Sequence, residues 1–142
     1  MRLEYDIKTT PEETSGYNLT AYTEGVLRLL VGSSVFLEVD GILLVEFAIV
    51  LHKWLLQCAS APTDFYYASM DFEEEPILMF RYDSGRDAFL LESVWSNKDV
   101  GSVLRSDAIE AASRYLVALR DELKRERGVD LERTLEEATL DG

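Results

Sequence analysis

The segment 42–56, ILLVEFAIVLHKWLL, constrains the fold most strongly, because it is the longest apolar run in the chain. Glu46 and Lys53 within it, and Gln57 just after it, are spaced seven and four residues apart, which places them on one narrow stripe of an α-helix. The rest of the helix surface is apolar, so we expect a buried core helix. The run is too short and too interrupted by charge to cross a bilayer, which needs about 20 apolar residues. No membrane segment is therefore expected.

Period-2 patterns predict β-strands before and after this helix. In residues 2–8, Leu3, Tyr5 and Ile7 alternate with charged residues, as in a strand with one solvated face. Residues 25–40 contain two β-branched apolar runs separated by Gly32-Ser33-Ser34, which is typical of a hairpin that ends at Asp40-Gly41. Three further strands forming a meander are expected at 65–71, 76–82 and 88–95, with a glycine able to take positive φ in the turn at 83–87.

A second helix is predicted near the C-terminus. Asp107 and Glu110 have the spacing of a capping box, and Gly128 is the predicted C-cap. Apolar residues between them repeat every three or four positions: Ile109, Ala112, Leu116, Leu119 and Leu123. We therefore expect a single α+β domain over 1–128, in which an antiparallel sheet of about five to six strands packs against the buried central helix and this amphipathic helix. The acidic C-terminal tail, 129–142, either forms one more short helix from Asp130 or frays.

The charge balance limits the kinds of partner. The chain has 27 acidic and 14 basic residues, a formal net charge of -13. Nucleic-acid backbones bind clustered Lys and Arg, so direct nucleic-acid binding is not expected, whereas a strongly acidic protein attracts cationic partners. Cys58 is the only cysteine, which excludes an intramolecular disulfide. Together with an N-terminus that lacks a signal-peptide pattern, it predicts a cytoplasmic protein.

The sequence offers no pattern that predicts an enzyme. His52 is the only histidine, and Cys58 lies about 120° away from it around a helix, so the two do not share a face. No nucleotide-binding or zinc-protease motif is present, and no cofactor is expected. Asp71 and Glu73–Glu75 lack the glycine and the alternating ligands of a calcium loop, so we expect no metal site. We predict no catalytic residue.

Acidic residues are concentrated in the segment 61–99, which has nine acids and three bases. In a meander, its two acidic turns lie at opposite ends of the strand 76–82, giving two clusters. Alternation along the strand at 65–71 sends at least one aromatic ring outward, and charge-rimmed aromatic side chains are typical of interface hot spots. Trp54 and Trp95 are expected in the core. The candidate partner-binding residues are Asp71, Glu73, Glu74, Glu75, Tyr66, Tyr67, Asp83 and Asp87.

Two readings without a partner remain open. A charged turn also protects an apolar meander from pairing with other chains, and an outward aromatic ring can pack under a helix or the tail. A structural or scaffolding homodimer, in which the acids serve solubility alone, is then the alternative function.

The segments 43–55, 65–80 and 89–95, followed by the helix from Asp107, resemble small acidic bacterial immunity proteins of toxin–immunity loci and related uncharacterised bacterial domains. The resemblance implies a cytosolic, non-enzymatic protein that covers a cognate toxin, often a cationic one whose site is built to hold nucleic acid. It implies no catalytic residue, because immunity proteins share none. The expected state is a monomer or a homodimer.

Overall fold

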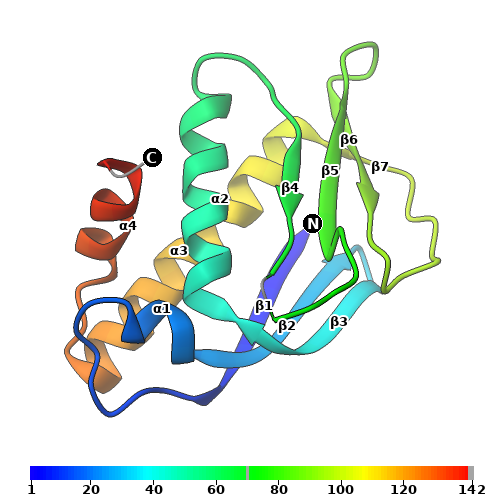
Figure 1. The fold of residues 1–142 in the computed structure, drawn as a ribbon. Coiled ribbons are helices and arrows are strands. Elements are labelled where there is room, and N and C mark those ends of the chain that lie inside the picture. The colour runs from blue at the N-terminus through cyan, green and yellow to red at the C-terminus, as the bar shows by residue number, and fades with distance from the viewer. Residues whose placement is uncertain (70, 141–142) are drawn as a thin grey trace.

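The computed structural model describes residues 1–69 and 71–140 and confirms the α+β class (Figure 1). Within these ranges the chain forms seven strands and four helices. In chain order they are β1 (Arg2–Thr9), α1 (Asn18–Tyr22), β2 (Glu24–Val31), β3 (Ser34–Leu43), α2 (Leu44–Cys58), β4 (Phe65–Tyr67), β5 (Leu78–Asp83), β6 (Ala88–Glu92), β7 (Ser102–Leu104), α3 (Arg105–Arg127) and α4 (Leu131–Leu140). None of the helices in the described ranges is both long enough and apolar enough to span a membrane.

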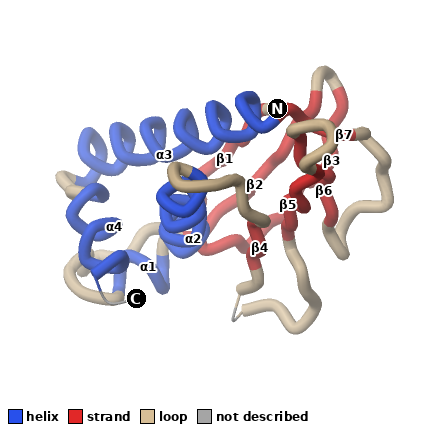
Figure 2. The backbone as a smooth tube through the Cα atoms, turned by 90° about the horizontal axis from the view of Figure 1, so that it is seen from above, coloured by secondary structure: helices blue, strands red, loops and turns tan. Residues whose placement is uncertain are grey.

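The strands form two antiparallel sheets, where the sequence predicted one sheet of five to six strands. One sheet has the order β1-β2-β3 and the other has the order β4-β5-β6-β7. The chain enters α2 directly after β3 and returns in β4, which stands at the edge of the second sheet and pairs with β5. Strand β7 was not predicted, since three residues are too few for a period-2 pattern. The helices gather on one side of the molecule and the strands on the other (Figure 2).

Helix α2 supplies the centre of the core, as its sequence predicted. Phe47 is fully buried, and its ring lies edge-on to Tyr67 at 5.0 Å, to Tyr115 at 5.2 Å and to Phe65 at 5.9 Å between centroids. These three rings come from β4 and α3, so one side chain of α2 joins elements that are distant in sequence. Trp54 is buried two turns later and donates a hydrogen bond from Nε1 to the carbonyl oxygen of Thr63 at 2.8 Å.

The first hairpin turns at Gly32-Ser33, as predicted, and Gly32 has a φ of 61°. Strand β3 does not end at Asp40-Gly41 but continues to Leu43, because Gly41 takes a φ of 76° at a register shift and the strand resumes beyond it. On β2, Gly25 allows a very close approach of β1: a Cβ atom there would lie 1.9 Å from the carbonyl oxygen of Asp6.

The meander is present, but its strands are shorter than predicted. The predicted strand 65–71 ends at Tyr67, and its residue 70 lies outside the described residues. In the turn after β5, Asp87 takes the positive φ of 51°, where the sequence pattern favoured the glycine. Strand β6 ends at Glu92, so Trp95 lies in the following loop and is 47% exposed. The prediction of Trp95 as a core residue was wrong, because the alternation was extended past the end of the strand.

The C-terminal helices agree with the prediction except at the start of α3. That helix begins at Arg105, with Leu104 at the N-cap and no capping hydrogen bond from a side chain, so Asp107 lies in the first turn and forms no capping box. Gly128 is the predicted C-cap, with a φ of 64°. The tail forms the short helix α4 as far as the described residues extend, and the Asp130 carboxylate accepts a hydrogen bond from the Arg133 backbone N–H at 3.3 Å.

Candidate protein-binding surface

Strand β4 presents one aromatic ring to the solvent. Phe65 and Tyr67 point into the core, while Tyr66 is 47% exposed, which confirms the predicted alternation. The Tyr66 hydroxyl donates a hydrogen bond to Glu75 Oε1 at 2.9 Å, and this bond raises the pKa of the phenol. The bond ties the ring of Tyr66 to the acidic loop, so the two features that the sequence singled out lie together.

Tyr67 does not lie on the surface. Its side chain is fully buried, and its hydroxyl donates to Glu46 Oε1 on α2 at 2.8 Å. Burial raises the pKa of this phenol well above its ordinary value, and the charge of Glu46 adds to the shift. As a contact residue for a partner, Tyr67 is therefore corrected to a core residue. The alternation in the sequence showed that either the odd-numbered or the even-numbered residues of β4 face outward, but not which of the two sets.

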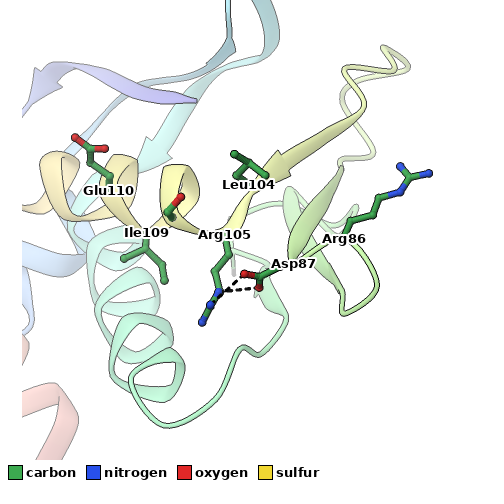
Figure 3. Close-up of a pocket in the computed structure, with 7 residues that line it drawn as sticks. Arg86, Asp87, Leu104, Arg105, Ile109 and Glu110 are labelled. Atoms are coloured by element: carbon green, nitrogen blue, oxygen red, sulfur yellow. Dashed lines mark hydrogen bonds and ion pairs between the residues drawn. The ribbon is translucent and has the colours of Figure 1, made fainter.

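The acids of the turn at 83–87 are held by arginines. Asp87 pairs with Arg105 Nε at 2.8 Å, as Figure 3 shows, and accepts a hydrogen bond from the Tyr82 hydroxyl at 2.6 Å. These two contacts, with the Tyr82 bond the larger, lower the pKa of the Asp87 carboxyl. Asp83 lies 3.7 Å from Arg86 Nε and accepts the Gly85 backbone N–H. The charge of this cluster is balanced within the fold, and Asp87 ties the turn to the start of α3.

The acids of the loop at 71–75 have a different environment. Asp71, Glu73, Glu74 and Glu75 are all exposed. Within the described residues, none of them forms an ion pair with an arginine or lysine. Of the two acidic clusters that the sequence predicted, this one keeps its negative charge available to the solvent.

Two acids from the first sheet lie beside this loop. Glu24 at the start of β2 and Asp40 on β3 line a hollow of about 560 Å³ together with Gly41, Asp71 and Phe72. Neither acid forms an ion pair in the part of the chain that the structure describes. The hollow therefore joins carboxylates from three separate segments, and the negative field extends from the loop onto the first sheet.

An aromatic pair made of the half-buried Phe72, which lines the same hollow, and the exposed Trp95 extends this region. The ring of Phe72 lies edge-on to Trp95, with 5.9 Å between centroids. The loop that carries Trp95 is fixed at two points: the Val94 backbone N–H donates to the carbonyl oxygen of Pro76 at 3.0 Å, and Lys98 Nζ donates to that of Val35 at 2.8 Å.

The acids of the loop and of the first sheet, together with the aromatic rings beside them, form what we call the acidic–aromatic surface: Glu24, Asp40, Tyr66, Asp71, Phe72, Glu73, Glu74, Glu75 and Trp95.

Sequence reasoning missed Glu24, Asp40, Phe72 and Trp95 as members of this surface. Glu24 and Asp40 belong to the first hairpin, and no local pattern indicates that its end meets the loop after β4. For Trp95, the available signal was the polar stretch that follows it, SNKD, which marks the end of a strand.

The described residues also include the groups from which a metal site or a nucleophile would be built. Among them, no three His, Cys, Asp or Glu side chains are arranged to hold a metal ion. Cys58 is buried, and this burial raises the pKa of its thiol, whereas a nucleophilic cysteine needs a lowered one. Its Sγ lies 3.9 Å from the carbonyl oxygen of Thr63.

The fold defines an α+β domain with two antiparallel sheets and, at one end of both, an exposed surface of acids and aromatic rings. The chain belongs to the DUF7878 family, a domain of unknown function, which matches residues 1–125. No match was found among curated proteins or among solved structures. The whole acidic–aromatic surface lies inside the family domain, and α4 lies outside it.

Proposed function

We propose that this protein is a non-enzymatic protein-binding module, an immunity protein that neutralises a cationic toxin through the acidic–aromatic surface. One observation carries the proposal: the acids of this surface have no cationic partner within the described residues, whereas the acids of the turn at 83–87 are paired with Arg86 and Arg105. A surface that keeps its charge unpaired is suited to a partner that supplies the opposite charge.

The charge and the aromatic rings have different roles in this proposal. A net charge of -13 steers a cationic protein toward the domain and raises the association rate. Once the complex forms, Tyr66 and Trp95 are partly exposed rings that lose water, and desolvated aromatic contacts slow dissociation. Salt screens the first effect much more than the second. The single free cysteine fits a reducing cytosol, where an immunity protein protects its own cell.

Apolar residues on the helices favour the alternative function, a scaffolding homodimer. Leu56 on α2, Val117 on α3 and Leu140 on α4 are exposed. A dimer that buries them would leave the acids of the loop at 71–75 to serve solubility. In that case the protein binds no basic partner, and this absence distinguishes the alternative from the proposed function.

The test measures the dissociation constant of the purified partner at low and at high salt. The variant changes Glu73, Glu74 and Glu75 to Lys. We expect weaker binding that is more pronounced at low salt, with the folded state intact by circular dichroism, because charge interactions across a binding interface are screened by ions. A dissociation constant equal to that of the wild type at both salt concentrations would remove this surface from the proposal.

A control variant separates the position of the charge from its amount. Glu12, Glu126 and Glu136 are exposed and lie elsewhere, so changing them to Lys alters the net charge by the same amount. We expect this control to reduce binding less than the loop variant does. Equal losses in the two variants would mean that only the total charge matters.

A further inference from the structure

Helix α4 is a short arm attached to the outside of the family domain. In Figure 1 it lies beside α2, on the side away from the strands. Two leucines of the arm, Leu131 and Leu135, are buried, and one ion pair joins it to α3: Arg120 Nη1 to Glu132 Oε1 at 2.9 Å. The family match ends at residue 125, so the arm lies beyond the residues that it covers.

The connection between α3 and α4 is a three-residue hinge, residues 128–130. Gly128 takes a left-handed conformation; its N–H bonds to the Lys124 carbonyl oxygen at 3.0 Å, and the Val129 N–H bonds to that of Leu123 at 3.2 Å. These bonds end α3 and turn the chain back onto the domain. The chain therefore turns from the direction of α3 back onto the domain at this left-handed glycine.

Helix α4 packs on a surface between α2 and α3, which we call the seat, and it does not fill this surface completely. A groove of about 410 Å³ remains between α2, α3 and α4, with Leu55, Leu116, Val117 and Leu135 among its lining residues. At the end of the arm, Leu140 is 86% exposed. Apolar surface thus remains open along the seat.

We infer that α4 is an exchangeable arm, and that the seat between α2 and α3 accepts the α4 of a second copy of this chain. The seat already fits this helix, and an arm from another copy offers it the same two leucines and the same glutamate. Straightening the hinge at Gly128 directs the arm away from its own domain. The apolar side chains around the two seats then provide further surface for the copies to bury.

Electrostatic repulsion between two copies opposes this exchange, so dimer formation should depend on the salt concentration. Each copy carries a net charge of -13, so two copies repel each other at low salt. We expect the wild-type protein to change from a monomer to a dimer as its concentration rises, and to do so more readily at high salt. Light scattering coupled to size-exclusion chromatography measures the molar mass directly.

The hinge variant Gly128→Ala tests the role of the glycine. Alanine disfavours the left-handed conformation and favours continuation of α3 into α4, so the dimer fraction should rise above that of the wild type at equal concentration. Gly101→Ala is the matched control: Gly101 has a φ of 72°, and a Cβ atom at either glycine meets nothing within 4 Å. The control carries the same strain far from the hinge and should keep the wild-type dimer fraction.

A charge exchange shows whether the arm binds in trans. Two Gly128→Ala proteins are mixed, one carrying Arg120→Glu and the other Glu132→Arg. Only a mixed dimer with exchanged arms restores an opposite-charge pair at both seats, so mixed dimers should exceed the random proportion of about half, as judged by a mass tag on one chain. A random proportion, or a Gly128→Ala protein and a wild type that both stay monomeric at high concentration and high salt, would overturn the inference.

Discussion

Two buried tyrosines should lower the free energy of unfolding at alkaline pH. The size of the loss can be worked out, because each phenol keeps its proton in the folded chain and loses it in the unfolded chain. Tyr67 and Tyr115 are buried, and burial raises the pKa of both phenols well above the ordinary value near 10. Above about pH 10 the unfolded chain loses these protons while the folded chain keeps them. The unfolded state then binds fewer protons, so the free energy of unfolding falls as the pH rises.

The size of the loss depends on the pKa in the unfolded chain, provided that the folded values lie well above the pH used. For one phenol with an unfolded pKa of about 10, the loss at about pH 11 is about 1.4 kcal/mol, so the two together cost about 2.8 kcal/mol relative to about pH 8. Urea unfolding at both pH values measures the total alkaline loss, which also includes the phenols of Tyr5, Tyr66 and Tyr82, whose pKa is raised as well. The share of Tyr67 and Tyr115 is therefore the difference between the wild type and variants at these two positions. The buried Cys58 thiol adds a loss of its own, which is the same in the wild type and in tyrosine variants.

Single replacements by phenylalanine separate the two contributions. Tyr67→Phe loses the bond to Glu46, and Tyr115→Phe loses its bond of 3.0 Å to the Leu44 carbonyl oxygen. Each should cost about 1 kcal/mol at about pH 8 and remove about 1.4 kcal/mol of the alkaline loss. Tyr22→Phe is the control, because this exposed ring is solvated in both states. If Tyr67→Phe and Tyr115→Phe keep the whole alkaline loss, the reasoning is refuted.

Three other substitutions test the packing. Gly25→Ala should cost about 3 kcal/mol in urea unfolding, since its Cβ would lie 1.9 Å from the Asp6 carbonyl oxygen and force β1 to move; a neutral result would contradict this close approach. Phe47→Ala should cost about 4 kcal/mol in the same assay, because it leaves a cavity among three rings, and a loss below about 1 kcal/mol would contradict its central place. Trp95→Phe should remove most of the fluorescence that iodide quenches, and Trp54→Phe should retain it. The opposite result would mean that the exposed indole is that of Trp54 and not that of Trp95.

The sequence predicted the parts of the fold that depend on local periodicity. The apolar run at 42–56 became α2, the alternation of Leu3, Tyr5 and Ile7 became β1, and Gly128 ended α3. The division into two sheets could not be predicted, because strand pairing depends on contacts between distant residues. The capping box at Asp107 failed because the helix starts two residues earlier, where Leu104 precedes it in the short strand β7.

The candidate surface was predicted in part for the same reason. The loop acids Glu73 and Glu74 are consecutive in sequence and exposed, so composition was enough to find them. Glu24 and Asp40 reach the same place only through the register of the first hairpin, and Trp95 only through the end of β6. The sequence also gave no means of distinguishing the two acidic clusters, because the arginine that balances Asp87 is 18 residues away.

Capture of a partner at low salt tests the central claim most directly. The wild type, the variant with Glu73, Glu74 and Glu75 changed to Lys, and the control variant with Glu12, Glu126 and Glu136 changed to Lys are each used as bait in lysate of the native host, and mass spectrometry identifies the eluted proteins. The account predicts one basic protein, in stoichiometric amount, with the wild type and the control but not with the loop variant. An equal amount of that protein with all three baits, or no basic protein with any of them, would contradict it.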